Sequence, residues 1–236
     1  MKLQLYNAIK DAPLPHHVDI WLVRLNHDQP QDLAALLSLL DERERERYQR
    51  LHHSHKLHYL FSHAACRQIL AQYTKLSAKE IRYNTNAYGK PRLSHDTTIR
   101  FNMSHSHELA IIAISGHAEI GVDLEYSERK TDWSNLARRF FSPQEVSYLF
   151  QQQEKAQRLS FFQLWTRKEA FIKALGTGLS TPLDSFNVCS KQVIERLKPS
   201  VNELSWYQAD LKVAAPYLAS LVQNTPIEKI RYYSYP

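Results

Sequence analysis

Residues 120–125, IGVDLE, place two carboxylates two positions apart. On a β-strand, residues with this spacing point to the same face, about 6.5 Å apart along the chain. Asp123 and Glu125 would therefore share one face, while Val122 and Leu124 occupy the other. Converging hard oxygen ligands suit Mg²⁺, which keeps several waters and binds substrate phosphates. The same alternation is the usual pattern of a half-buried strand, and spacing alone favours that simpler interpretation.

A second cluster, WTRKEAFIK, spans residues 165–173. In a helix, Glu169 and Lys173 are four residues apart and share a face with Trp165, one turn earlier. A carboxylate beside a cation can act as a general base, and two lysines, Lys168 and Lys173, can hold phosphate oxygens. The alternative is an ordinary surface ion pair worth roughly a few tenths of a kcal/mol, and the cluster taken alone favours it.

Two further segments carry polar residues at the ends of elements. Residues 101–106, FNMSHS, put Ser104 and His105 at the end of a strand, where both can donate to phosphate. Adjacent residues on an extended chain point apart, so a serine–histidine relay is not expected. Residues 142–145, SPQE, form a capping box that explains Glu145 without a metal. That carboxylate would also serve a metal only if its second oxygen pointed into the site.

The elements that must position these clusters are a mixture of strands and helices. Short β-rich runs bounded by turn residues predict strands over residues 18–25, 99–103, 109–115, 120–125, 186–189 and 211–214. Apolar residues at helical spacing, or alternating charges, predict helices over residues 32–40, 41–50, 51–75, 133–141, 142–153 and 159–175. Residues 81–93 are rich in turn formers and predict a loop. No regular βαβ order emerges, so the predicted fold class is α+β.

Composition limits the chain to one large domain or two modest ones. Its 236 residues are 43% hydrophobic and 23% charged, an ordinary globular balance. No apolar run approaches the roughly 20 residues of a membrane helix, and the first residues lack a secretory signal. Cys66 and Cys189 have no metal or redox spacing, which predicts reduced residues in a cytosolic protein. The net charge of +6 favours an anionic partner, whether nucleic acid, phosphate ligand or acidic protein.

Residues 51–75 contain a group of histidines: His52, His53, His55, His58 and His63. His52 and His55 lie one helical turn apart, as a metal site would require. The same stretch carries an apolar stripe typical of a core helix with histidines on its wet side. No carboxylate or cysteine completes a ligand set, so the core helix is the preferred interpretation.

In this order and spacing, the three clusters resemble the 4′-phosphopantetheinyl transferases, specifically the larger, two-halved, surfactin-type group. The family patterns NxSHS, (I/V)G(I/V)D(I/L)E and W(S/T)xKE(A/S)xxK correspond to FNMSHS, IGVDLE and WTRKEAFIK. Three shorter segments also match the family, at residues 88–91 (YGKP), 139–145 (RFFSPQE) and 178–186 (GLSTPLDSF). The resemblance covers roughly residues 40–190. Together the motifs outweigh the simpler interpretations of Asp123, Glu125, Lys168 and Glu169.

The resemblance implies two similar α/β halves related by a pseudo-two-fold axis, with coenzyme A and Mg²⁺ in the cleft between them. The boundary is expected near Gly116. Residues 1–116 would form the N-terminal half, and residues 117–236 the C-terminal half with the metal and catalytic motifs. The implied enzyme moves the 4′-phosphopantetheine arm of coenzyme A to a serine of an apo acyl, peptidyl or polyketide carrier protein and releases adenosine 3′,5′-bisphosphate. We expect a cytoplasmic monomer that binds neither nucleic acid nor membrane.

Residue roles follow from the same resemblance. The implied metal ligands are Asp123, Glu125 and Glu145. The implied contacts to the phosphates of coenzyme A are Lys90, Ser104, His105, Lys168 and Lys173. Glu169 is the expected base that takes the proton of the carrier serine, and His105 and Lys168 complete the catalytic group.

One position departs from the family, and two rival functions remain to be weighed. Where the family commonly has an arginine on the nucleotide phosphate, a gapless alignment places His58, which predicts a weaker contact. A basic nucleic-acid-binding module would use the positive charge but leaves IGVDLE unexplained, because carboxylates repel phosphate unless a cation intervenes. The second rival is a non-catalytic coenzyme A binder of the same fold. Every carboxylate of the family motifs is present in this sequence, and a protein that only binds coenzyme A would not need them all.

Overall fold

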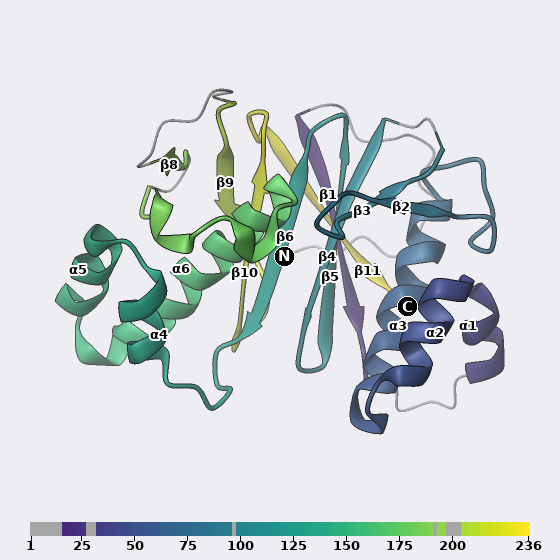
Figure 1. Cartoon of the computed structure of the whole chain (residues 1–236), viewed down its shortest axis with the longest axis horizontal. Helices are drawn as coiled ribbons and strands as arrows, with labels where there is room; N and C mark the ends of the chain where they lie inside the picture. The colour runs from purple at the N-terminus through teal and green to yellow at the C-terminus, as the bar shows by residue number, and fades with distance from the viewer. Residues whose placement is uncertain (1–15, 27–31, 96–97, 191–192, 197–203) are drawn as a thin grey trace.

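The computed structural model describes residues 16–26, 32–95, 98–190, 193–196 and 204–236. Two sheets occupy the middle of the molecule, and a group of helices lies at each end (Figure 1). The helices are α1 (Leu33–Leu39), α2 (Glu42–Arg50), α3 (His53–Ala71), α4 (Trp133–Phe140), α5 (Pro143–Gln151) and α6 (Glu154–Leu175). Helices α1–α3 lie beside the first sheet and α4–α6 beside the second.

The first sheet has the strand order β11-β1-β5-β4. Its strands are β1 (His17–Arg24), β4 (Ile99–Ser106), β5 (Leu109–Gly116) and β11 (Lys229–Tyr235). Strand β5 pairs antiparallel with both β1 and β4. It buries both of its faces, which is why its sequence is apolar from Leu109 to Ile114 instead of alternating.

The last strand of the chain returns to the first sheet, where β11 pairs parallel with β1. An ion pair holds this return. Arg231 donates from Nε and Nη2 to the two carboxylate oxygens of buried Asp19, at 2.5 and 2.9 Å. Tyr73, just after α3, donates its hydroxyl to the same carboxylate at 2.8 Å. The carboxylate of Asp19 thereby joins β1, β11 and the segment that follows α3.

The second sheet has the order β6-β10-β9 and consists of β6 (Ile120–Tyr126), β9 (Tyr207–Asp210) and β10 (Tyr217–Gln223). Two short hairpins complete the strands, namely β2 (Tyr83–Thr85) with β3 (Pro91–Leu93) and β7 (Phe186–Asn187) with β8 (Glu195–Arg196). Short 3-10 turns, η1 (Gly178–Ser180) and η2 (Leu183–Ser185), follow α6. Helix α6 ends at Gly176, whose φ of 72° is the left-handed value expected of a glycine cap.

Three apolar layers hold these elements together. One face of the first sheet, with Ile112 and Ile114, packs with Ile69 of α3. Its other face, with Ile111, packs with Val122 of the second sheet. The remaining layer joins the second sheet to α4, α5 and α6 around the buried rings Phe161, Phe162 and Phe171. The order of layers is therefore helix, sheet, sheet, helix.

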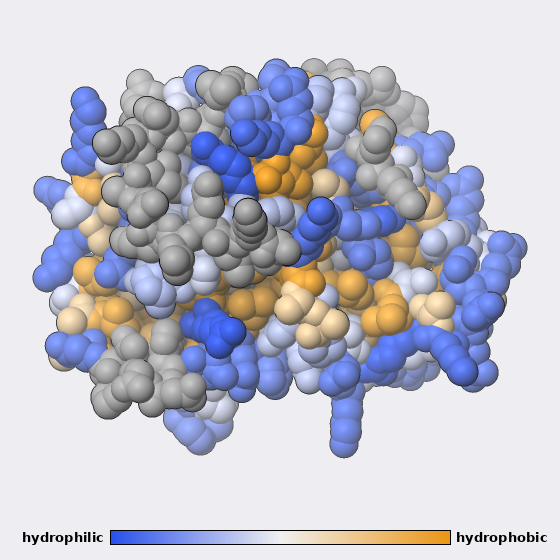
Figure 2. Space-filling model, turned by 180° about the vertical axis from the view of Figure 1, so that it is seen from behind, coloured by the Kyte–Doolittle hydropathy of each residue, from blue (hydrophilic) through white to orange (hydrophobic). Residues whose placement is uncertain are grey.

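Apolar and hydrophilic side chains occupy different parts of the rear face of the molecule, the face that Figure 1 does not show. Seen from behind, apolar side chains gather in the middle of this face, and hydrophilic side chains dominate its two ends (Figure 2). None of the helices in the described part of the chain is long and apolar enough to cross a membrane.

The mixture of helices and sheets agrees with the predicted class, and most predicted elements are present within a few residues. Four differences stand out. Residues 211–214 were predicted as a strand but connect β9 to β10, and of these four residues only Leu211 is buried, in the layer between the sheets. Strands β8, β9, β10 and β11 were not predicted. The predicted loop over residues 81–93 contains the β2–β3 hairpin, and α6 begins at Glu154, earlier than expected.

Candidate active site

Strand β6 and helix α6 approach each other closely, and Gly121 makes this approach possible. A Cβ atom on Gly121 would lie 2.0 Å from the carbonyl oxygen of Ala170 and 2.3 Å from the amide nitrogen of Ala174. A side chain at this position would collide with helix backbone. Gly121, Asp123 and Glu125 alternate along β6, so they share the face that meets α6.

Asp123 is 4% exposed and lies at the centre of the site. Its Oδ1 accepts from Lys173 Nζ at 2.5 Å and from Ser104 Oγ at 2.8 Å. Its Oδ2 is buried without a hydrogen-bond partner in the described part of the chain. A buried carboxylate oxygen without a partner is unfavourable in a folded protein, and a cation or a water bound there would satisfy it.

Glu125 lies on the same face, half-buried. Arg129 donates to its Oε1 at 3.1 Å, and Ser106 Oγ donates to its Oε2 at 3.3 Å. Burial, and then the negative charge of Asp123, raise the pKa of Glu125 to about 7, although Arg129 opposes the change. Without a further cation, Glu125 is therefore partly protonated near neutral pH.

Glu169 contributes a third carboxylate from α6. Within the described residues, no hydrogen bond or ion pair engages it. Burial, and then the charge of Asp123, raise its pKa, whereas Lys173 lowers it. A half-buried carboxylate with free oxygens and a raised pKa is suited to accepting a proton near neutral pH.

The donor set fits a divalent cation at the Asp123–Glu125 pair. No group of three or more histidine, cysteine, aspartate or glutamate side chains in the described part of the chain has metal-binding geometry. Mg²⁺ does not need one, because it is often held by one or two carboxylates, waters and substrate phosphates. The unpartnered Asp123 Oδ2, and the repulsion that raises the pKa of Glu125, are both relieved by a cation between them.

Lys168 and Glu145 lie outside this group. Both are fully buried, and Lys168 Nζ is 2.7 Å from Glu145 Oε2. Lys168 also donates to the carbonyl oxygens of Leu183 and Phe186, at 2.6 and 3.0 Å. Burial lowers the pKa of Lys168, and Glu145 opposes that change. The lysine is thus used within the protein core and does not reach the carboxylates of β6.

Both carboxylate oxygens of Glu145 accept hydrogen bonds from the protein. Its Oε2 accepts from the Ser142 amide at 2.8 Å and the Ser142 hydroxyl at 2.9 Å, besides Lys168. Its Oε1 accepts from the Val188 amide at 2.9 Å. The capping box predicted for Ser142 and Glu145 is present. Three of these four donors bind Oε2 and one binds Oε1, and together they account for Glu145 through helix capping and the buried ion pair.

Lys90 is also occupied. Its Nζ donates to the carbonyl oxygens of Ala174 and Ile120, at 2.8 and 3.0 Å, and lies 3.3 Å from Glu119 Oε2. Burial is the first cause of its lowered pKa. Lys90 therefore ties the β2–β3 hairpin to the end of α6 and to β6, a contact different from the phosphate contact expected from the sequence.

Lys173 lies beside the carboxylates, and its charge also reaches His105. His105 is exposed by its surface area, yet the protein around it excludes enough water to lower its pKa, with the charge of Lys173 among the smaller causes. Lys173 Nζ also donates to Ser104 Oγ at 2.9 Å. The structure thus brings together Ser104, Asp123, Glu125, Glu169 and Lys173, whereas His105 belongs to the opposite face of β4 from Ser104.

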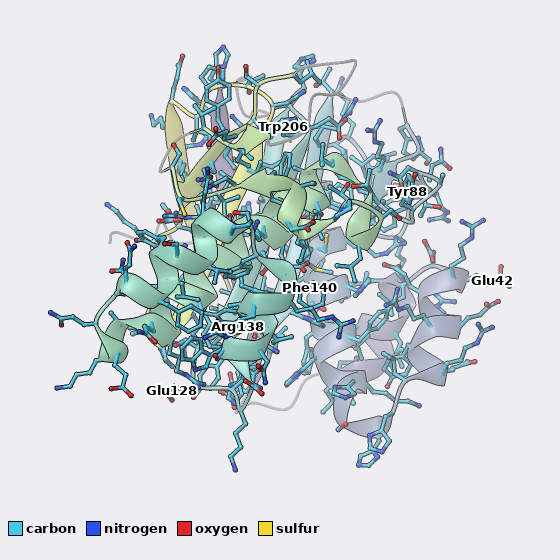
Figure 3. The ribbon with its side chains drawn as sticks, turned by 60° about the vertical axis from the view of Figure 1, so that its left-hand side comes forward. Glu42, Tyr88, Glu128, Arg138, Phe140 and Trp206 are labelled. Atoms are coloured by element: carbon cyan, nitrogen blue, oxygen red, sulfur yellow. The ribbon has the colours of Figure 1, made fainter. Side chains whose placement is uncertain are left out.

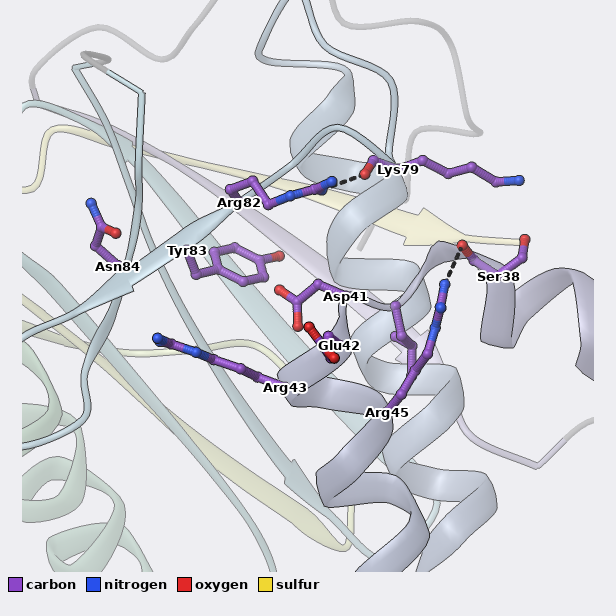
Figure 4. A pocket seen from close by; sticks show the side chains of 10 residues that line it. Ser38, Asp41, Glu42, Arg43, Arg45, Lys79, Arg82, Tyr83 and Asn84 are labelled. Carbon is purple, nitrogen blue, oxygen red and sulfur yellow. Dashed lines mark hydrogen bonds between the residues drawn. The ribbon is translucent and has the colours of Figure 1, made fainter.

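Two adjoining cavities lie on the same side of the first sheet. The larger, about 670 Å³, carries the basic side chains Arg43, Arg45, Lys79 and Arg82 (Figure 4). The second, about 300 Å³, extends to Phe101, Asn102 and Met103, directly before Ser104. Asp41, Arg43 and Tyr83 line both, so the two form one groove, but Asp123, Glu125 and Glu169 are not among the residues that line it. His58 is not among the residues that line either cavity.

Sequence reasoning missed three residues of the site. Gly121 stands within a predicted strand, and an interior glycine is a known sign of close backbone approach. Ser106 is two residues after Ser104 and so shares its face of the strand, but no separate role was predicted for it. Arg129 follows Glu125 by four residues in a turn, where no helical spacing draws attention to it.

Two family models match the chain. One, described as the 4′-phosphopantetheinyl transferase superfamily, matches residues 119–222, and one described as 4′-phosphopantetheinyl transferase, N-terminal, matches residues 27–117. Among curated relatives, 4′-phosphopantetheinyl transferase Sfp of Bacillus subtilis (strain 168) is 36% identical over 79% of this chain and 76% of its own length. The transferase HetI of Nostoc sp. is 34% identical over 71% of this chain and 72% of its own.

A solved structure also shows a partial likeness. The holo-[acyl-carrier-protein] synthase of Thermotoga maritima matches 44% of this chain and 61% of its own, with 22% identity and a TM-score of 0.37. A score this low does not establish a shared arrangement of elements.

Proposed function

The chain belongs to the 4′-phosphopantetheinyl transferase superfamily and transfers phosphopantetheine to carrier proteins, and we propose that it does so with Mg²⁺ bound between Asp123 and Glu125. The observation that carries this proposal is the buried Asp123 Oδ2, which has no hydrogen-bond partner among the described residues, while the nearby Glu125 carboxylate repels the charge of Asp123. Glu145 is left out of the proposed ligand set because it is paired with buried Lys168, away from the carboxylates of β6.

Bound Mg²⁺ would neutralise charge on the pyrophosphate oxygens of coenzyme A during transfer. The remaining steps belong to the chain itself. Glu169, with both oxygens free, takes the proton from the carrier serine. The serine oxygen then forms a bond to the β-phosphorus, the bond to the α-phosphate oxygen breaks, and adenosine 3′,5′-bisphosphate leaves with that oxygen.

Lys173 has two uses in this scheme. Its ammonium lies 2.5 Å from Asp123 Oδ1, where it balances one of the negative charges of the site. Substrate phosphates that bind at the same carboxylates come within reach of its long side chain, which can then donate to their oxygens. His105, which is exposed, is the second proposed phosphate donor. Lys168 and Lys90 act instead by fixing α6.

Coenzyme A is proposed to occupy the groove described above. Its nucleotide phosphates would lie among Arg43, Arg45, Lys79 and Arg82, where Figure 4 shows basic side chains around the cavity. The groove ends at Phe101, Asn102 and Met103, and the next residue of β4, Ser104, donates to Asp123, so the pyrophosphate is proposed to lie beyond this end, beside the carboxylates of β6. The basic residues of the first cavity, which Asp41 and Glu42 also line, would attract the nucleotide phosphates, and the carboxylates of β6 would suit reacting phosphates that bring a metal.

The carrier is proposed to dock beside α4. Arg138 and Arg139 are exposed in its last turn, and Figure 3 labels Arg138. The Arg138 guanidinium lies 4.2 Å from the centroid of the Phe150 ring of α5. An acidic partner would be attracted to such a surface.

The arrangement in two similar halves also remains a proposal. Each half has a long helix, α3 or α6, packed on a sheet, and the family models meet near Gly116. Strand β11 is the exception, since it lies in the first sheet although it comes from the end of the chain. A groove and carboxylates supplied by one chain support action as a monomer. The free thiols Cys66 and Cys189 support a reducing, cytoplasmic setting.

The experiment that tests the proposal follows a carrier protein by mass. Apo carrier is incubated with the protein, coenzyme A and either Mg²⁺ or a chelator. We expect the carrier to gain one phosphopantetheine group only with Mg²⁺, and adenosine 3′,5′-bisphosphate to appear in equal amount. Equal transfer with the chelator would contradict the proposed role of Mg²⁺, while the transferase activity itself would stand.

A further inference from the structure

Strands β4 and β6 belong to different sheets, yet side chains join them along their length. Asn102 Oδ1 accepts from the Val122 amide at 2.8 Å. Ser104 Oγ donates to Asp123 Oδ1 at 2.8 Å. The partners advance together along both strands, so β4 and β6 run in the same direction.

At the third position, Ser106 makes two hydrogen bonds to β6. Its Oγ accepts from the Tyr126 amide at 3.0 Å and donates to Glu125 Oε2 at 3.3 Å. Asn102, Ser104 and Ser106 are every second residue of β4, so one face of this strand supplies all the contacts. These three residues form a side-chain ladder between the sheets.

The direction of each hydroxyl proton is fixed by its other contact. Ser106 accepts from a backbone amide, which leaves its own proton for Glu125. Ser104 accepts from Lys173 Nζ at 2.9 Å, which leaves its proton for Asp123. Each carboxylate on β6 thus receives one oriented donor from β4, and at Asp123 this contact leaves Oδ2 without a partner among the described residues.

We propose that Ser104 and Ser106 are positioning residues that orient the two metal-binding carboxylates, with Asn102 setting the register of the ladder. The inference rests on the metal site of the proposed function. Hydrogen-bond partners of metal ligands typically change metal affinity about 10–100-fold when removed. The first sheet therefore helps to build a metal site whose ligands all come from the second.

A matched pair of variants separates positioning from general stabilisation. Ser106→Ala removes the donor to Glu125. Ser115→Ala removes a buried hydroxyl on β5 that has no hydrogen-bond partner in the described part of the chain, and is the control. Free Mn²⁺ is measured by electron paramagnetic resonance during titration of each folded protein, and thermal unfolding with chelator is recorded in parallel.

We expect Ser106→Ala to weaken Mn²⁺ binding about 10–100-fold, while Ser115→Ala binds like the wild type. Ser106→Thr keeps the hydroxyl and should restore most of the affinity. Transfer activity of Ser106→Ala should recover at high Mg²⁺, which a merely loosened fold would not do. If Ser106→Ala does not fold, Ser104→Ala is judged by the same criterion at Asp123.

The outcomes distinguish the two claims. A wild-type protein that binds no Mn²⁺ contradicts the proposed metal site and, with it, this inference. A wild type that binds Mn²⁺ while Ser106→Ala binds equally well overturns the inference alone and leaves the metal site standing.

Discussion

At the scale of single residues, the site is a balance of charges in a confined space. Asp123, Glu125 and Glu169 face two nearby cations, Lys173 and Arg129, so negative charge is in excess. The raised pKa values of Glu125 and Glu169 are the consequence. A protein that keeps such a cluster does so at a cost to its own stability, as expected where charge serves a ligand.

This cost predicts a stabilising substitution. In the unfolded chain Glu125 ionises near its ordinary pKa of 4.5, whereas in the metal-free fold it does so at about 7. The folded state therefore binds more protons between these values, and stability falls as pH rises from 4.5 to 7. Glu125→Gln cannot ionise and so avoids this fall in stability. It should raise the unfolding free energy at pH 8 by an amount on the order of 1–3 kcal/mol.

Thermal unfolding with chelator at pH 5 and pH 8 measures this effect. The variant should exceed the wild type at pH 8, and the difference should shrink at pH 5, where folded Glu125 is protonated. A variant that is less stable at both pH values would mean that Arg129 and Ser106 outweigh the repulsion from Asp123.

The second prediction at this scale concerns Glu169. Glu169→Gln keeps the shape of the side chain but cannot accept the serine proton, so kcat should fall roughly 10²–10⁴-fold with coenzyme A affinity nearly unchanged. Both quantities are measured at saturating Mg²⁺. Unchanged kcat would exclude the base role. A loss of coenzyme A and Mg²⁺ affinity along with the rate would make Glu169 a metal ligand instead.

The motif residues themselves were predictable from the sequence, but their division of labour was not. The spacing of Asp123 and Glu125 and the pairing of Glu169 with Lys173 follow from strand and helix periodicity. Lys168 stands next to Glu169, and one residue turns a helical side chain by about 100°, so Lys168 points into the core. Its partner Glu145 lies in another helix, and no local pattern reveals that pairing.

At the scale of elements, the site depends on how closely α6 lies against β6. Gly121→Ala would place a methyl group 2.0 Å from the Ala170 carbonyl oxygen. Since backbone atoms on both sides must move, we expect a loss of about 1–3 kcal/mol or more and a large loss of transfer activity. Chemical denaturation measures the first and carrier mass the second.

Gly178→Ala is the control for this substitution. Gly178 has open space around its Cβ position but a φ of 54°, so only backbone strain of roughly 1–2 kcal/mol is added. Activity of the folded Gly178→Ala protein should be retained. Equal activity losses in the two variants would show that the approach of α6 to β6 is not what matters at Gly121.

The buried ion pair gives a second prediction for elements. Lys168→Met leaves Glu145 buried without its cation and should cost about 3–5 kcal/mol. Adding Glu145→Gln should recover much of that loss, because no unpaired charge remains. The KM for coenzyme A should hardly change in the double variant. A raised KM with stability intact would instead support the phosphate contact first expected for Lys168.

Helices were easier to predict than strands, for a physical reason. The cap at Gly176 and the capping box at Ser142 are local signals, and both helix ends are where they predict. Strands β10 and β11 are paired with segments about 90 and 210 residues earlier in the chain, respectively. Such pairings are decided by tertiary packing, which no short window of sequence contains.

At the scale of the whole molecule, the two sheets cooperate in one site. The first sheet supplies the groove and the hydroxyls of Ser104 and Ser106, and the second supplies the carboxylates. Lys90 ties the β2–β3 hairpin to α6 and β6, and the ion pair of Asp19 with Arg231 joins β1 to β11 at the other side of the first sheet. The resemblance of the motifs to the family predicted the activity, whereas the contacts between sheets required the structure.

The most direct test of the central claim is the rate of carrier modification by Asp123→Ala as Mg²⁺ is increased. Asp123 lies between both sheets and offers the unpartnered oxygen. We predict a folded variant with most activity lost at the Mg²⁺ concentration that saturates the wild type, and partial recovery at higher Mg²⁺. Full activity of Asp123→Ala, with a chelator still inhibiting it, would contradict the account by placing the metal elsewhere.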